Sequence, residues 1–185
     1  MSSYNRNSRK PIQALQLALA ATLLGGSAAH AAEPSGAFEL TAFSDGVAGA
    51  ELAAGDYASA ARQLKSHTYE PDGGSLSTNR CVAFVATRQL QAARVACDAA
   101  IRDTEQAMNT LEVSLSTSRA EYRSYLALAY SNRAVLNWLS NDTVAAQADL
   151  RKAQTMDPKA EVVERNLSAL QNHSTVAQIA VTPKS

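Results

Sequence analysis

Residues 132–153, which read NRAVLNWLSNDTVAAQADLRKA, decide the fold of this chain. Apolar or small residues recur there at helical spacing, stop at Asn141-Asp142 and then resume. This rhythm predicts two antiparallel helices joined by a tight turn. Ala134 and Ala146 stand at matching points of the two halves, where we expect the helices to come closest.

Two earlier windows share this organisation. Residues 47–64 read VAGAELAAGDYASAARQL, and residues 79–100 read NRCVAFVATRQLQAARVACDAA. Each window breaks at a polar turn, at Gly55-Asp56 and Arg88-Gln89 respectively. Aromatic residues make up only 5% of the chain while alanine is abundant, a composition that favours close-packed helices over an all-β fold. The sequence therefore predicts an all-α protein of about three helix pairs.

The windows resemble the tetratricopeptide repeat (TPR), a 34-residue helix pair with small residues where its helices touch and a proline at its end. Residues 130–134 and 153–158 are especially typical, and the resemblance covers most of residues 41–160. It implies a short TPR-like α-solenoid. Val163, Leu167 and Leu170 then share one stripe, which predicts a C-terminal capping helix over 160–170.

The spacing between the second and third windows is longer than one repeat. Their first residues, Asn79 and Asn132, are 53 positions apart, which leaves 19 residues beyond the repeat length. We interpret residues 103–122 as a lengthened second helix, a polar break and an early start of the third pair near Arg119. A flexible loop of this size would be unusual in a compact domain.

The N-terminal region has the order of a secretory signal peptide. Arg6, Arg9 and Lys10 precede an apolar run over 12–24, and Ala29-His30-Ala31 supplies an A-x-A cleavage site. A membrane anchor is the alternative, but the run is short and no stop-transfer pattern follows. We therefore expect a signal peptide over 1–31 and a periplasmic or secreted product. The remaining organisation is a linker over 32–40, a helical domain over 41–171 and a mobile tail over 172–185.

Charge and hydropathy limit the partners. The whole chain has 17 basic and 17 acidic residues, and residues 1–31 hold three of the basic ones and no acidic one. The product without them carries a net charge of −3 (14 minus 17), which is unsuited to nucleic acid because phosphate binding needs a basic surface. No later stretch reaches the length of a membrane span.

Residues that could carry chemistry are sparse. Only His67 and His173 remain after cleavage, and no cluster with metal-ligand spacing, nucleophile elbow, phosphate-binding glycine loop or dinucleotide fingerprint is visible. We therefore expect no metal, no cofactor and no enzymatic activity. Two small polar groups are weaker candidates for a site: His67, Tyr69, Glu70 and Asp72, and Glu121, Tyr122 and Arg123.

Cys81 and Cys97 are predicted to form a structural disulfide. Each lies eight residues from the turn at Gln89, so two antiparallel helices would bring them to the same level. An exported chain meets an oxidising compartment, and an even cysteine count suits one bridge. The alternative is that both thiols are small core residues.

Asn79 and Asn132 occupy equivalent places in two first helices. The TPR resemblance implies that first helices line a concave groove, where an asparagine amide can bind the backbone of an extended peptide as both donor and acceptor. In an empty groove we expect these amides to be hydrated. The other expected groove residues are apolar: Val82, Val85, Leu128, Val135 and Trp138. A cationic clamp for a C-terminal carboxylate is not expected, since Leu128 and Asn132 stand where the cations would be needed.

Three functional hypotheses follow, of which the first two are the stronger. The first is an exported TPR-like adaptor that binds a peptide or protein partner in the groove. The second is a structural component of an envelope complex, assembled through the ends of the stack. An enzyme whose site is built from scattered residues is a third and weaker candidate.

The first testable prediction concerns export. The exported protein should begin within a few residues of Ala32, because the small-residue stretch ends at Ala31. N-terminal sequencing of the product recovered from the envelope or the medium checks this. Recovery of intact residues 1–10 in that fraction would contradict it.

Overall fold

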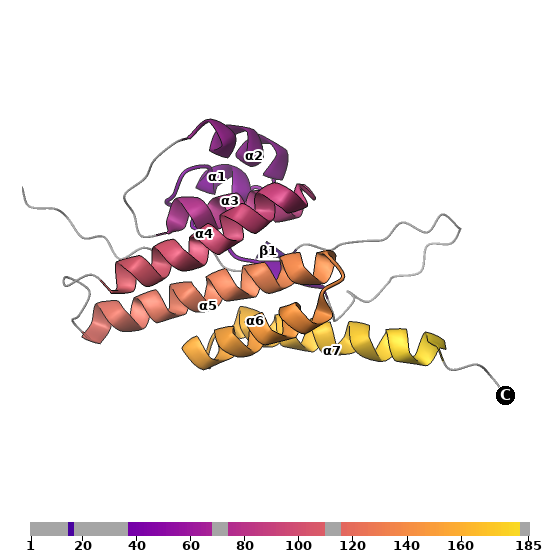
Figure 1. The fold of residues 1–185 in the computed structure, drawn as a ribbon. Helices are drawn as coiled ribbons and strands as arrows, with labels where there is room; N and C mark the ends of the chain where they lie inside the picture. Colours follow the sequence, from indigo (N-terminus) through magenta and orange to yellow (C-terminus); the bar gives the residue numbers. More distant parts are fainter. Residues whose placement is uncertain (1–14, 17–36, 68–73, 110–115, 182–185) are drawn as a thin grey trace, which may run out of the picture.

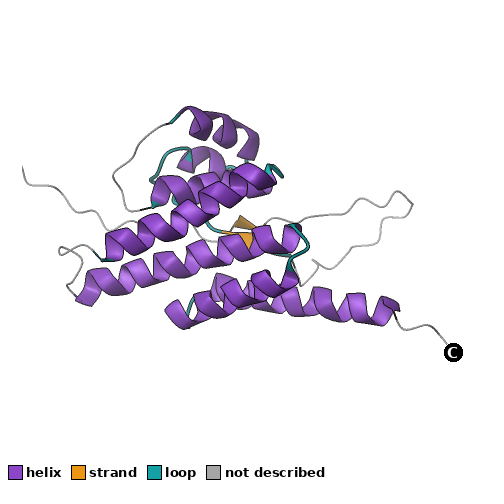
Figure 2. Ribbon diagram, viewed as in Figure 1, coloured by secondary structure: helices purple, strands orange, loops and turns teal. Residues whose placement is uncertain are grey.

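The computed structural model describes residues 15–16, 37–67, 74–109 and 116–181. The protein is all-α, as expected: most of the described residues lie in helices (Figures 1 and 2). The helices are α1 (Gly49–Ala53), α2 (Tyr57–Ser66), α3 (Ser75–Ala86), α4 (Leu90–Met108), α5 (Ser116–Leu139), α6 (Thr143–Met156) and α7 (Glu161–Val181). Two short strands, β1 (Leu15–Gln16) and β2 (Glu39–Leu40), pair antiparallel.

The three windows form helix pairs with turns of one kind. Gly55, Arg88 and Asn141 take positive φ angles of 76°, 57° and 61° between the two helices of each pair. The backbone N–H of the following residue then donates to the carbonyl five residues earlier, at 2.9 Å in each turn. This left-handed residue with a five-residue return bond is a common helix ending, and it satisfies carbonyls that the helix leaves unpaired. Asp56 and Asp142 cap the next helix through their side chains.

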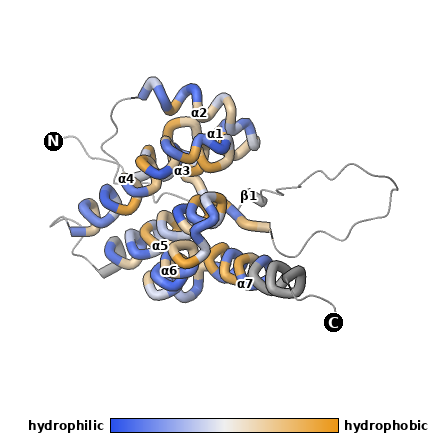
Figure 3. The backbone as a smooth tube through the Cα atoms, turned by 45° about the vertical axis from the view of Figure 1, so that its right-hand side comes forward, coloured by the Kyte–Doolittle hydropathy of each residue, from blue (hydrophilic) through white to orange (hydrophobic). Residues whose placement is uncertain are grey.

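Small side chains allow the helices of each pair to pack closely. Ala134 on α5 and Ala146 on α6 are both fully buried, as are Ala93 and Ala100 on α4. Polar and apolar residues alternate along the helices (Figure 3), so each presents an apolar stripe to its neighbours. Helix α4 also packs on α5, and α6 on α7, which joins the pairs into one body.

Cys81 on α3 and Cys97 on α4 form a disulfide. Their Cα atoms are 4.6 Å apart, and both side chains are fully buried. The bridge ties together the two helices of the second pair, in agreement with the prediction from the cysteine spacing and against two free thiols.

The additional residues between the second and third pairs extend helices. Helix α4 runs to Met108 and α5 begins at Ser116, three residues before the expected start at Arg119. The residues expected to break the helix, 116–118, lie inside α5, while 110–115 fall outside the described residues. Helix α7 is longer than the expected cap and includes most of the predicted tail, up to Val181.

The N-terminal part of the domain differs from the expected linker over 32–40. Its described residues, 37–40, belong to the fold, because Phe38 and Leu40 are each only 2% exposed. Strand β2 pairs with β1 in the register Leu15↔Leu40 and Gln16↔Glu39. Apart from these two residues of β1, the predicted signal peptide lies outside the described residues. Within the described part, no helix is both long enough and apolar enough to cross a membrane.

The second testable prediction concerns the disulfide. Replacing both cysteines (Cys81→Ala with Cys97→Ala) should lower the free energy of unfolding by about 3 kcal/mol, because the bridge restricts the unfolded chain. Urea unfolding of the double variant and of the oxidised wild type measures this difference. Peptide mapping without reduction should show the two cysteines joined, and equal unfolding midpoints would contradict a stabilising role.

Candidate functional site

Three asparagines bind the backbone of one extended segment, residues 38–43. The side-chain amide of Asn132 accepts from the N–H of Thr41 at 2.9 Å and donates to the carbonyl of Thr41 at 2.8 Å. Asn166 binds Glu39 in the same two-bond manner, at 2.7 and 2.9 Å. Asn79 binds Phe43 likewise, at 2.8 and 2.9 Å. We call Asn79, Asn132 and Asn166 the asparagine ladder.

The ladder binds the backbone of every second residue because of strand geometry. Successive N–H and C=O groups of an extended chain point to opposite edges, so only alternate residues can face one row of side chains. The three asparagines come from α3, α5 and α7. Helices α3 and α5 are the first helices of the second and third pairs, and α7 follows the third pair. The 38–43 segment therefore crosses these helices from α7 to α3.

The asparagines of the ladder are completely enclosed. Asn79 and Asn166 are 0% exposed, and Asn132 is 1% exposed. Asn79 and Asn132, which we expected to meet water in an empty groove, bind the protein's own 38–43 segment instead. Whether these residues also bind a separate partner stays a prediction.

Side chains of the even-numbered residues of the segment enter the main hydrophobic cluster. Phe38, Leu40 and Ala42 are buried in the cluster that also holds Val85 and Val135. The cavity where Phe38 and Leu40 meet those two valines has a volume of only about 10 Å³, which is at the lower limit for a single water. The segment is thus packed as closely as a core element.

An ion pair between a buried carboxylate and a partly exposed guanidinium holds one odd-numbered residue. The carboxylate of Glu39, whose side chain is 3% exposed, contacts the Nε of Arg165 at 2.7 Å. The hydrogen bond that the Arg165 guanidinium donates to Glu39 raises the pKa of Arg165, so the cation stays charged at any physiological pH. Arg165 precedes Asn166 on α7, so neighbouring residues bind the side chain and the backbone of Glu39.

Aromatic rings hold both ends of the segment. At one end, the ring of Phe38 lies 4.5 Å from that of Trp138 and stacks on His173 at 5.7 Å, centroid to centroid. At the other end, Phe43 meets Tyr125 edge-to-face at 5.0 Å. These distances are those of favourable aromatic pairs, so the segment is anchored at both termini as well as along its backbone.

The expected groove residues fall into two groups. Val82, Val85, Val135 and Trp138 belong to the cluster that receives the 38–43 segment. Leu128 belongs to a second cluster, with residues of α6 and α7 such as Ala153 and Val163. The structure thus places four of the five apolar residues in the cluster that the segment enters, and Leu128 elsewhere.

The sequence analysis missed Asn166 and the segment itself. Asn166 follows Asn132 by 34 residues, one repeat length, and this spacing could have identified it. The segment reads FELTAF, an alternation that is typical of a strand but too short to decide a strand on its own.

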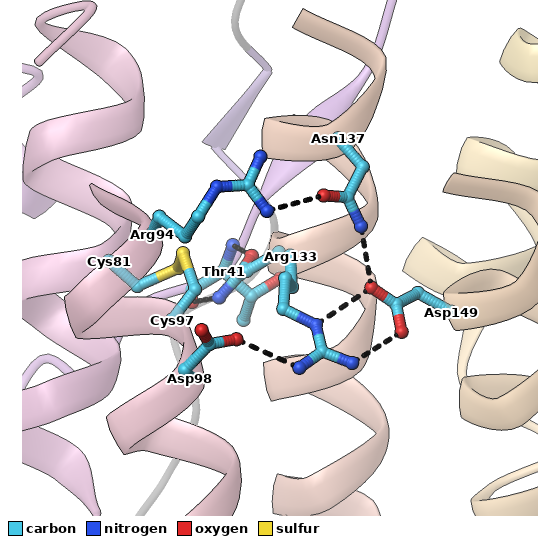
Figure 4. The surroundings of a disulfide bond; sticks show 9 residues. Thr41, Cys81, Arg94, Cys97, Asp98, Arg133, Asn137 and Asp149 are labelled. Atoms are coloured by element: carbon cyan, nitrogen blue, oxygen red, sulfur yellow. Dashed lines mark hydrogen bonds and ion pairs between the residues drawn. A yellow bond between two sulfur atoms is a disulfide. The ribbon is translucent and has the colours of Figure 1, made fainter. Parts of the chain in front are cut away.

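A charged network keeps α4, α5 and α6 in register beside the ladder (Figure 4). The guanidinium of Arg133 on α5 binds both carboxylate oxygens of Asp149 on α6, at 2.7 and 2.8 Å, and Asp98 on α4 at 2.9 Å. Asn137 donates to Asp149 as well, at 2.9 Å. Hydrogen bonds with Asp149 raise the pKa of Arg133, which therefore remains a permanent cation. Since Arg133 follows Asn132 directly, the network fixes the middle of the ladder.

The two weaker polar candidates are described only in part. His67 is exposed at the end of α2, and Tyr69, Glu70 and Asp72 lie outside the described residues. Glu121 accepts a hydrogen bond from the hydroxyl of Tyr125. Within the described ranges, no group of three His, Cys, Asp or Glu side chains is placed to hold a metal ion.

One open pocket lies next to the Phe38 end of the segment. It has a volume of about 270 Å³. Its lining residues come from the turns and helix ends of the second and third pairs: Arg88, Trp138, Leu139, Asn141 and Thr143. Trp138 therefore contacts the segment with its ring and also lines this pocket.

Comparisons of the chain with protein-family models, with curated proteins and with solved structures found no match. The resemblance to the TPR family rests on the sequence windows alone and stays a prediction.

The third testable prediction concerns the ladder. Asn132→Ala should lower the free energy of unfolding by about 1–3 kcal/mol, because it leaves the buried N–H and C=O of Thr41 without partners. The control is Gln147→Ala on the exposed side of α6, which should change stability by less than about 0.5 kcal/mol. Chemical unfolding of both variants checks the difference, and equal stabilities would show that Asn132 does not hold the segment.

Proposed function

We propose that this protein is an exported, TPR-like helical adaptor that binds an extended segment of a protein partner. The observation that carries the proposal is the asparagine ladder, which binds backbone groups of every second residue in the 38–43 segment. Backbone recognition of this kind accepts many side-chain sequences, and extended peptides are commonly bound through their main chain.

The open pocket suggests where a partner would contact the protein. It lies at the Phe38 end of the segment, and its wall contains Trp138. Tryptophan and arginine are among the residue types that most often dominate binding energy at interfaces, and the exposed Arg88 lies in the same wall as the partly buried Trp138. A partner side chain in this pocket would sit next to a backbone that is already extended.

The second candidate function is assembly into a larger envelope complex. A separate observation favours it: Val95 on α4 and Val144 on α6 are 71% and 79% exposed, although both are large aliphatic residues. Single exposed aliphatic residues are common on protein surfaces, so this evidence is weaker than a continuous apolar patch would be.

The fourth testable prediction separates the two functions by site-specific photo-cross-linking in cells. A photoreactive amino acid replaces Thr143, which lines the pocket, or Val95, which is exposed on α4. The adaptor hypothesis predicts partner cross-links from position 143 and few from position 95. Mass spectrometry of the products should place the partner's attachment site in one extended segment.

Additional substitution of Trp138→Ala should reduce the cross-links from position 143, because it removes a pocket wall. Circular dichroism of the purified variant must show an unchanged helix content for this comparison to hold. Cross-links from position 95 alone would favour the assembly function, and cross-links from neither position would contradict partner binding at the pocket.

A further inference from the structure

Strand β2 has a second edge that the asparagine ladder does not use. The ladder binds the N–H and C=O groups of Glu39, Thr41 and Phe43. Because successive backbone groups of a strand alternate in direction, those of Leu40 and Ala42 point to the opposite edge. The segment is therefore held along one edge by helices, and its other edge is the side on which β1 pairs.

Strand β1 pairs with β2 on that opposite edge. Leu15 stands opposite Leu40 and Gln16 opposite Glu39, in antiparallel register. In an antiparallel pair, hydrogen-bonded and non-hydrogen-bonded positions alternate. Since the backbone of Glu39 is bonded to Asn166, the Leu15–Leu40 position is the one that can carry the inter-strand hydrogen bonds.

The two residues of β1 belong to the apolar run over 12–24 that the sequence analysis assigns to the signal peptide. Cleavage near Ala31 would separate β1 from the domain and leave the backbone groups of Leu40 without their strand partner. An unpaired strand edge is a template for another extended chain.

We propose that this second edge is a strand-addition site, which β1 occupies in the full-length chain and an extended partner segment occupies after export. The proposal rests on the proposed function, and it names the way in which the partner binds. The partner segment adds antiparallel to residues 38–42 and leaves the asparagine ladder in place.

The rigidity of the 38–43 segment favours the addition of a second strand over displacement of the segment. Six ladder hydrogen bonds, the Glu39–Arg165 ion pair and the aromatic contacts of Phe38 already hold the segment extended. A preformed strand loses little conformational entropy when a second strand pairs with it. Displacing the segment would instead break all of these contacts.

The register also defines the chemistry of the partner segment. Residues opposite each other in an antiparallel pair have their side chains on the same face. Leu40 faces the main hydrophobic cluster, so the partner residue opposite it should be aliphatic. The same holds for the residue opposite Phe38, two positions away along the partner segment.

The test uses the exported protein with its N-terminus verified, and amide hydrogen exchange measured by NMR. The probe is a synthetic peptide of residues 12–18, IQALQLA, with a solubilising lysine at each end. Strand addition predicts that the peptide slows exchange at Leu40 and Ala42 at least about tenfold, while exchange at Thr41 and Phe43 stays unchanged. Full-length protein that retains residues 1–31 should show slow exchange at Leu40 without the peptide.

A matched control peptide carries N-methyl groups on the alternate backbone amides that would face Leu40, so that it has the same side chains but its methyl groups block close approach to the strand edge and remove its donors. It should give no protection at Leu40.

Two results would overturn the inference. Faster exchange at Thr41 and Phe43 would show that the peptide displaces the segment, which contradicts strand addition but retains peptide binding in the groove. Unchanged exchange at every position would contradict strand addition, while the cross-linking at position 143 still tests the proposed function independently.

Discussion

The two-bond contact between an asparagine amide and the backbone of a single residue is the interaction on which this arrangement depends. Its donor and acceptor match an N–H and a C=O of an extended chain, so the contact behaves as one rung of a β-ladder contributed by a helix. Three such rungs, from α3, α5 and α7, hold the 38–43 segment extended at the centre of an all-α protein. Since the asparagines are buried, each rung also satisfies polar groups that would otherwise destabilise the fold.

The rungs work together only if their helices keep a fixed spacing, and several interactions maintain it. The disulfide between Cys81 and Cys97 joins α3 to α4, and Arg133 connects α4, α5 and α6 through Asp98 and Asp149. Helix α7 is fixed to the segment itself by the Glu39–Arg165 ion pair. The carboxylates of Asp149 and Glu39 are buried, so removing the arginine partner of either would leave an uncompensated charge. These contacts therefore specify how the helices are placed more than they add to the stability of the fold.

Local signals in the sequence were sufficient for the helix pairs, because turns and small residues follow from neighbouring positions. The turn at Asn141 and the bridge between Cys81 and Cys97 were both predictable in this way. The conformation of the 38–43 segment was not, because the hydrogen-bond partners along one of its edges are side chains that lie 36, 91 and 127 residues away. No periodicity within six residues can reveal such partners. Asn79 and Asn132 could be selected from their equivalent positions, but the chain that they bind could not be identified from sequence.

The central claim is that the protein's own 38–43 segment occupies the asparagine ladder in solution. Isotope-edited nuclear Overhauser spectroscopy on the full-length protein tests it most directly. The account predicts cross-peaks between the side-chain amide protons of Asn132 and the backbone protons of Thr41, with equivalent pairs for Asn166 with Glu39 and Asn79 with Phe43. Absence of these cross-peaks, together with random-coil chemical shifts for residues 38–43, would contradict it.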